Sequence, residues 1–133
     1  MAIDPEAQDS FVAMLKRSGL IEETFLSQLL DEFKKSTVHP FADSITSLTM
    51  MFVSRGLLTN WHVAKLREGK YKGFFLDDLL LLDYLKSSKA FITYLARDRK
   101  RNVLCKVNLF PPKSLDAPRE MIKYEVEDFE GQS

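Results

Sequence analysis

The first half of the chain carries apolar residues at the spacing of amphipathic helices. The pattern predicts four helices, which begin near Asp4, Glu22, Pro40 and Thr59, and glycine stops follow three of them, at Gly19, Gly56 and Gly69. The positions expected to face the core are Phe11, Met14 and Leu15 in the first helix, Phe25, Leu26, Leu29, Leu30 and Phe33 in the second, and Phe41, Ile45, Leu48 and Phe52 in the third.

These helices read as two copies of one helix-turn-helix unit. Aligning Gly19 with Gly56 also superposes a set of apolar positions, namely Phe11 with Leu48, Leu15 with Phe52, Leu20-Ile21 with Leu57-Leu58, and Leu29 with Leu66. Because one copy alone cannot bury its apolar stripe, we expect the two copies to pack together. Two ordinary helical hairpins with similar turns are the alternative interpretation.

After Gly69 and Gly73 the periodicity changes from that of helices to that of strands. Continuous apolar runs at residues 79–85 and 91–96, followed by alternation over residues 103–110, predict three strands. The basic segment RDRKRN between the last two strands is predicted to be a solvated hairpin turn.

A fourth strand is predicted over residues 121–128. Apolar and polar residues alternate strictly here, with Ile122, Tyr124 and Val126 on one face and Lys123, Glu125 and Glu127 on the other. This strand is expected to be half-buried and antiparallel to residues 103–110 or to an adjoining strand. A helix over residues 118–129 is the competing prediction. The fold class is therefore α+β, with a helical region at residues 1–70 and a small antiparallel sheet of three to four strands at residues 71–133.

Composition excludes several classes of protein. The chain has 133 residues, 45% of them hydrophobic, and a formal net charge of zero, so it can build a core but has no overall field that attracts nucleic acid or membranes. Cys105 is the single cysteine, which excludes an internal disulfide and predicts a reducing, cytoplasmic location. No apolar run is long enough to span a membrane, and the acidic start is unlike a signal peptide.

Residue types that support chemistry are few. His39, His62 and Cys105 do not share metal-ligand spacing, so no metal site is predicted, and His62 is expected at a helix surface or cap. No serine has the histidine partner or the strand-turn-helix setting of a hydrolase. Lys106 alternates with an apolar face and is expected to point to solvent. Paired helices with glycine-containing turns leave helix-turn-helix DNA binding as a weak alternative, and nucleic acid is an unlikely partner.

The segment GLLTNWHVAKLREGKYKGFFL, residues 56–76, carries a recognisable set of motifs. It has a Gly-Leu-Leu-Thr start, an aromatic residue two positions on at Trp61, a Leu-x-x-Gly ending, and Gly73-Phe74 before the first strand. In these features it resembles the region that leads into the kinase domain of bacterial eukaryotic-like serine/threonine protein kinases. Those kinases usually have glutamine where this chain has His62.

The resemblance continues into the predicted sheet. Residues 79–85 and 93–98 are similar to the first two kinase strands, and residues 102–107 to the strand that bears the phosphate-pairing lysine. The stretch VEDFEG, residues 126–131, is similar to the kinase hinge. The resemblance therefore implies a kinase small lobe (N-lobe) in which Lys106 is the ATP-contacting lysine.

The chain departs from the kinase pattern at the glycine-rich loop. The three glycine positions fall on Lys86, Ser88 and Phe91, and Thr93 takes the place of the following valine. Side chains at the first two positions block close approach of the backbone to phosphates, and Phe91 adds a ring where the phosphates would lie. The segment between the Lys106 strand and the hinge strand is too short for the αC helix, so the glutamate that would hold Lys106 is expected to be missing.

These features together predict a non-catalytic protein. The sequence contains no kinase catalytic loop and no magnesium-binding Asp-Phe-Gly, so no enzymatic activity, cofactor or metal is expected. The resemblance implies a degenerate, pseudokinase-like small lobe that acts as an interaction or regulatory module with a protein partner, for which a kinase is one candidate. The alternatives are an inactive, truncated relic of a kinase with residual nucleotide binding at Lys106 and, more weakly, a helix-turn-helix DNA-binding protein.

Overall fold

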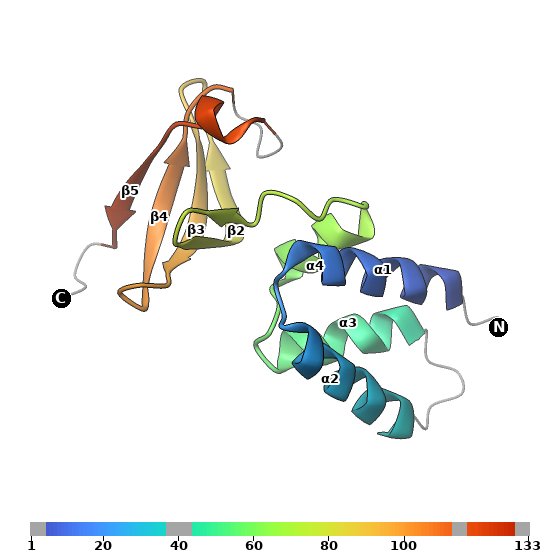
Figure 1. The fold of residues 1–133 in the computed structure, drawn as a ribbon. Helices are drawn as coiled ribbons and strands as arrows, with labels where there is room; N and C mark the ends of the chain where they lie inside the picture. The colour runs from blue at the N-terminus through green and yellow to red at the C-terminus, as the bar shows by residue number, and fades with distance from the viewer. Residues whose placement is uncertain (1–4, 37–43, 113–116, 130–133) are drawn as a thin grey trace. The chain divides into compact units, whose positions relative to one another are not determined.

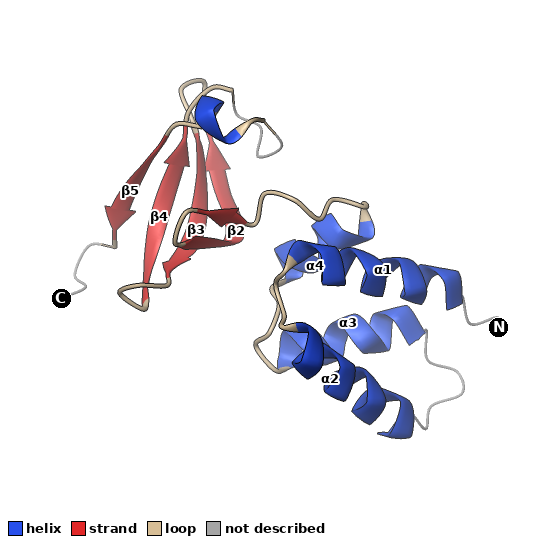
Figure 2. Cartoon of the chain, in the orientation of Figure 1, coloured by secondary structure: helices blue, strands red, loops and turns tan. Residues whose placement is uncertain are grey.

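The chain is organised as two compact units, Met1–Tyr71 and Lys72–Ser133. Its computed structural model describes residues 5–36, 44–112 and 117–129. Figures 1 and 2 show that the first unit is helical and that the second is a sheet. The predicted α+β class, with helices before an antiparallel sheet, is confirmed. The division between the units falls next to the one expected at residues 70 and 71.

All four predicted helices are present. They are α1 (Pro5–Ser18), α2 (Glu23–Ser36), α3 (Ser44–Ser54) and α4 (Asn60–Arg67). Gly19 and Gly56 follow α1 and α3 with φ angles of 74° and 73°, a left-handed backbone conformation that glycine adopts without strain. Asp4, Pro40 and Phe41, which were predicted at helix starts, lie outside the described residues.

The aligned positions of the two helical copies have matching burial. Both members of each large apolar pair are buried, namely Phe11 and Leu48, Leu15 and Phe52, Ile21 and Leu58, and Leu29 and Leu66. Helix α1 packs against α3 and α4, and the rings of Phe11 and Phe52 lie 6.3 Å apart between their centroids. The apolar stripes of the two copies therefore form one shared core, as the repeat pattern predicts.

One predicted core position in this unit is wrong. Phe25 is 43% exposed, and the buried stripe of α2 consists of Leu26, Leu29 and Phe33. The Glu22 carboxylate accepts the N–H groups of Thr24 and Phe25 at 3.1 and 2.9 Å, so it caps α2 and fixes the position of Phe25 in the first turn. The four-residue spacing of Phe25 from Leu29 is compatible with a shared face. The orientation of α2 about its axis, however, places Phe25 outside the buried face.

The second unit is a sheet of five antiparallel strands in sequential order. They are β1 (Phe75–Leu76), β2 (Leu79–Ser87), β3 (Ile92–Asp98), β4 (Val103–Leu109) and β5 (Tyr124–Asp128). The prediction of three to four strands missed β1, because two residues are too few to show an alternating pattern. The predicted strand near the C-terminus is confirmed as β5, which pairs with β4. The competing helix over residues 118–129 is wrong, because this range contains the short 3₁₀ turn Arg119–Met121 followed by β5.

One face of the sheet is buried and apolar. It carries Leu76, Leu79, Leu81, Tyr94, Ala96, Cys105, Val107 and Leu109. The Tyr124 hydroxyl in β5 donates to the Asp77 carboxylate in the β1–β2 turn, so the two edges of the sheet approach one another. The expectation that β5 would be half-buried is correct for Tyr124 and wrong for Val126, which is 41% exposed because it lies in an edge strand.

Candidate functional site

The loop that the sequence led us to compare with a glycine-rich loop, residues 88–91, is the hairpin turn between β2 and β3. Ser88 closes it by donating its N–H to the Phe91 carbonyl at 2.8 Å. The Ser88 hydroxyl also accepts the N–H groups of Ala90 and Phe91, both at 3.2 Å, and lies 3.2 Å from the Phe91 carbonyl. A phosphate-binding loop needs backbone N–H groups that are free to face the ligand. Here the serine side chain already occupies two of them.

Phe91 packs at the same end of the sheet. Its ring lies 5.5 Å from the ring of Phe110 between centroids, in an edge-on arrangement. Ile92 and Leu109 are paired, so Phe91 and Phe110 follow on the same side of the ladder as Thr93 and Asn108. The aromatic pair therefore adjoins these two polar side chains on the face opposite the apolar core.

Lys106 lies on that polar face in β4, as its alternation predicts. Its backbone neighbours across the sheet are Leu95 in β3 and Glu127 in β5. The Lys106 ammonium lies 5.3 Å from the centroid of the Phe129 ring, which is a cation–π distance. Among the described residues no carboxylate forms an ion pair with it, so the electrostatic partner seen here is an aromatic ring.

The predicted site residues share one side of the sheet but do not converge. Lys86 in β2 pairs with Thr93, whereas Lys106 in β4 pairs with Leu95, which lies two residues further along β3. One strand lies between the two lysines, and with the two-residue offset this corresponds to about 12 Å between their backbones. Ser88 and Phe91 belong to the hairpin turn at the end of the sheet. The four residues thus form no common cluster around a ligand-sized centre.

A polar network on the same face was not predicted. The Thr93 hydroxyl donates to Asn108 Oδ1 at 2.8 Å, and Asn108 Nδ2 donates to Glu127 Oε2 at 2.6 Å. Thr93 and Asn108 are buried, and Glu127 is exposed. The three residues come from β3, β4 and β5, so the network fixes the register of three strands. The sequence signal was weak, because only strand pairing brings these positions together.

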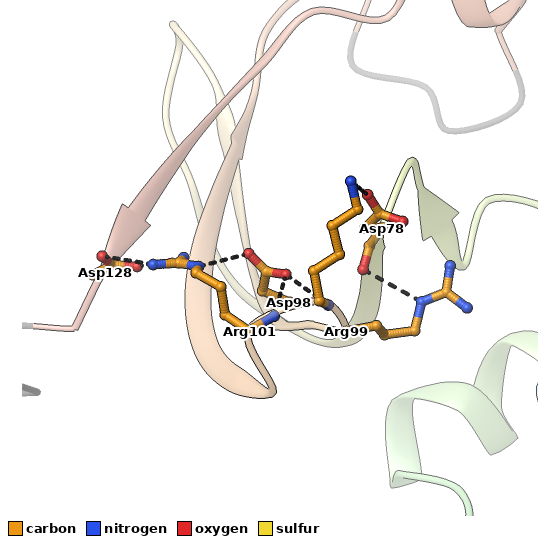
Figure 3. A network of polar contacts seen from close by, with 6 residues as sticks. Asp78, Asp98, Arg99, Arg101 and Asp128 are labelled. Carbon is orange, nitrogen blue, oxygen red and sulfur yellow. Dashed lines mark hydrogen bonds and ion pairs between the residues drawn. The ribbon is translucent and has the colours of Figure 1, made fainter.

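The basic hairpin turn between β3 and β4 is held by acidic residues, as Figure 3 shows. Arg101 contacts Asp98 at 2.8 Å and Asp128 at 2.9 Å, and Lys100 contacts Asp78 at 3.2 Å. Arg99 donates to the backbone carbonyls of Asp77 and Asp78 and lies over the ring of Phe75. The turn was predicted to be solvated, and its exposed cations also tie it to β5 and to the β1–β2 turn.

The charge network makes the stability of the sheet depend on pH. Hydrogen bonds from Arg101 hold the pKa of Asp98 and that of Asp128 below their ordinary values. The interactions that lower the pKa of a carboxyl group in the folded protein also stabilise the fold at neutral pH. This stabilisation is lost as the pH falls below about 4 and through the folded-state pKa. The network therefore favours the folded sheet at neutral pH and loses its effect in acid.

We expect Arg101→Gln to lower the melting temperature at neutral pH by no more than a few degrees, because the pairs are exposed. The difference from wild type should shrink as pH falls below about 4 and through the lowered pKa values of the two aspartates. Thermal melts over a pH series measure this. Arg99→Gln is the matched control, since Arg99 contacts backbone carbonyls and a ring, neither of which titrates. A gap for Arg101→Gln that stays constant down to pH 3 contradicts the prediction.

His62 is confirmed as a cap residue. Its Nδ1 accepts the N–H of Thr59 at 3.1 Å, and Thr59 Oγ1 accepts the His62 N–H at 3.1 Å, so the pair forms a reciprocal capping box at the start of α4. The His62 side chain is buried, so of the two predicted positions, a helix surface or a cap, the cap is the one observed. A glutamine side chain at this position could accept the same hydrogen bond.

Other reactive side chains are isolated. Cys105 is buried in β4, and burial raises the pKa of its thiol, which disfavours the reactive thiolate form. The described ranges contain no group of three or more histidine, cysteine or acidic side chains placed to bind a metal ion. Within the same ranges, no helix has the length and apolar character that crossing a bilayer requires.

Comparisons with known proteins return no match. No protein-family model matches the chain, and neither a curated protein nor a solved structure is significantly similar to it.

Proposed function

We propose that this protein is a non-catalytic, kinase small-lobe-like module that acts by binding another protein. The observation that carries the proposal is the closed hairpin at the position of the glycine-rich loop. Ser88 occupies the N–H groups of Ala90 and Phe91, which a nucleotide phosphate would otherwise need. The resemblance favours a protein kinase as the partner class.

The surroundings of Lys106 support the same function. In an ATP site the lysine pairs with phosphates and is held by a glutamate. Here its ammonium faces the Phe129 ring, and Phe91 is packed on Phe110 beside the same face. The rings of Phe129 and Phe91 thus occupy space next to the positions that the resemblance assigns to the nucleotide. These contacts favour a stabilising role for Lys106 within the sheet.

The surface of the sheet unit supports binding to a protein. Large apolar side chains are exposed at Tyr84, Leu85, Met121 and Val126. Exposed apolar residues are common singly, but four in a unit of this size offer contact area to a partner. The basic turn between β3 and β4 is a poor nucleic-acid site, because aspartates already pair with Lys100 and Arg101.

A nucleotide titration tests the proposal. We expect isothermal calorimetry with magnesium and ATP to show no saturable binding up to about 5 mM, since the loop donors are occupied. The double variant Ser88→Gly, Phe91→Gly opens the loop and should still transfer no phosphate to a generic protein substrate. Saturable binding of ATP to the wild-type protein at millimolar or lower concentration would favour the nucleotide-binding alternative and defeat the proposal.

A further inference from the structure

The sheet has two edges, and the edge formed by β2 is protected against pairing. Strand β1 pairs only with the first residues of β2, which leaves residues 82–87 at the edge. The register of β2 shifts twice in this stretch, between Leu81 and Asp83 and between Tyr84 and Lys86. The Asp83 carboxylate also accepts the Tyr84 N–H at 2.9 Å. Bulges and charged side chains are the devices by which natural sheets prevent addition of another strand.

The edge formed by β5 also carries charged side chains, at Glu125, Glu127 and Asp128, but it has no bulge. Its pairing with β4 runs through five consecutive residues without a register shift, from Tyr124 opposite Leu109 to Asp128 opposite Cys105. In the part of the chain that the structure describes, β4 is the one strand that pairs with β5, and the Tyr124 side chain at one end of β5 also contacts Asp77 in the β1–β2 turn. The β2 edge of the sheet is therefore irregular, whereas the β5 edge is regular.

The backbone hydrogen bonds to β4 show which backbone groups of β5 face outward. The Phe110 N–H donates to the Lys123 carbonyl at 2.9 Å, so residue 123 points its backbone toward β4. Alternate residues of an antiparallel strand point the same way, which turns Glu125 and Glu127 inward and Val126 and Asp128 outward. Val126 thus presents its N–H and C=O at the open edge together with a side chain that is 41% exposed.

The charges beside this edge define what it can accept. Glu125 and Glu127 are exposed on the face opposite the apolar core, on either side of Val126 in the strand. On an added antiparallel strand, the residues opposite the two glutamates would form the closely spaced pairs, with Cα atoms about 4.5 Å apart. Basic side chains at those positions would pair favourably, whereas acidic ones would repel.

We propose that the open edge of β5 binds an extended segment of another protein by strand addition, and that this segment alternates basic and apolar residues. The inference rests on the proposed interaction function and names its site and its ligand chemistry. The backbone of Val126 supplies the central hydrogen bonds, and Glu125 and Glu127 select the basic residues. The edge is continuous with the regular β4–β5 ladder, so the added strand would extend an existing sheet.

A second copy of this chain fits the edge poorly. Two β5 strands that pair antiparallel about Val126 would place Glu125 of each copy opposite Glu127 of the other. Two such like-charge pairs, each between directly opposed residues, are destabilising. The Asp128 carboxylates, already bound by Arg101, add further negative charge at the same edge. The charge pattern therefore favours a basic partner over self-association.

The test uses the full chain and a fluorescent peptide of about eight residues that alternates lysine and valine. We expect saturable, micromolar binding by fluorescence anisotropy, at least about tenfold tighter than for a glutamate-valine peptide of equal length. A lysine-valine peptide that is N-methylated at every residue keeps the charge but has no backbone N–H on either edge, so it cannot form the ladder. It should bind at least about tenfold more weakly than the unmodified peptide.

Variants of Val126 provide the matched protein controls. Val126→Pro removes one outward N–H, and proline is tolerated in edge strands when its nitrogen faces solvent. We expect this variant to melt cooperatively and to bind the peptide at least about tenfold more weakly. Val126→Thr keeps the N–H and the strand propensity, so its affinity should stay within about twofold of wild type.

Several outcomes would overturn the proposal. These are the absence of saturable binding to the lysine-valine peptide, equal binding of its N-methylated form, and sedimentation showing a dimer that Val126→Pro abolishes. If Val126→Pro fails to fold, the N-methylated peptide decides the question with the wild-type protein. Binding of ATP would defeat the proposed non-catalytic function and leave the peptide result standing, so the two failures can be told apart.

Discussion

Replacing Phe52 with alanine is expected to lower the free energy of unfolding of the helical unit by about 3 kcal/mol. The Phe52 side chain in α3 is fully buried, and its ring contacts that of Phe11 in α1. Truncation removes apolar contact area and leaves a cavity between the two helix-turn-helix copies, which rigid helices cannot close completely. Urea denaturation followed by circular dichroism at the helical wavelength measures the change.

The repeat supplies a second variant and a control. Leu15 aligns with Phe52 and is also fully buried, so Leu15→Ala should cost a similar amount, between about 2 and 5 kcal/mol. Met50 lies in the same helix as Phe52 but is 64% exposed, so Met50→Ala should change stability by less than about 0.5 kcal/mol. A loss below about 1 kcal/mol for both Phe52→Ala and Leu15→Ala would show that the core is placed wrongly.

Replacing Asn108 with leucine is expected to destabilise the sheet unit by about 2–3 kcal/mol. Asn108 accepts the Thr93 hydroxyl and donates to Glu127, and the side chains of Thr93 and Asn108 are 1% and 5% exposed. Leucine has nearly the same volume but leaves the buried Thr93 hydroxyl without its acceptor. A buried polar group that loses its partner bears the full cost of having left water.

The double variant separates this effect from packing. Thr93→Val removes the stranded hydroxyl, so Thr93→Val with Asn108→Leu should be more stable than Asn108→Leu alone. The coupling between the two sites should exceed about 0.5 kcal/mol, because residues in one hydrogen-bond network are not additive. Chemical denaturation of the four proteins of this cycle gives the value. The prediction is contradicted if the stability losses of the two single variants add up to the loss of the double variant, because the hydroxyl and the amide would then act independently.

Local pattern was sufficient to predict most of the fold. Helix ends followed from glycine at 19 and 56 and from Thr59 as a cap, and these signals act within one turn of the backbone. Strand β5 followed from strict alternation, which is also local. Strand β1 was missed because two residues hold no period. Phe25 was misplaced because the face that a helix buries depends on which neighbours it meets.

The site was less accessible to sequence reasoning. Lys86, Ser88, Phe91 and Lys106 could be named from a family pattern, and alternation placed Lys106 on the polar face. The hydrogen bonds that Ser88 makes within its own turn could not be inferred, because several turn types fit the same residues. The Thr93–Asn108–Glu127 network depends on the register of three strands, which single-strand patterns leave open. The contacts of the site therefore depend on strand pairing in three dimensions, which the local sequence pattern does not reveal.

The most direct test of the non-catalytic function observes the hairpin itself. In a two-dimensional nitrogen-15 NMR titration with magnesium and ATP, the backbone amides of Ala90 and Phe91 report on the loop, and the amide of Lys106 reports on β4. Because Ser88 already accepts both loop N–H groups, we expect these three signals to stay in place up to about 5 mM nucleotide. Saturable shifts of the Ala90 and Phe91 amides, accompanied by a shift at Lys106, would show a working nucleotide site and contradict the proposed function.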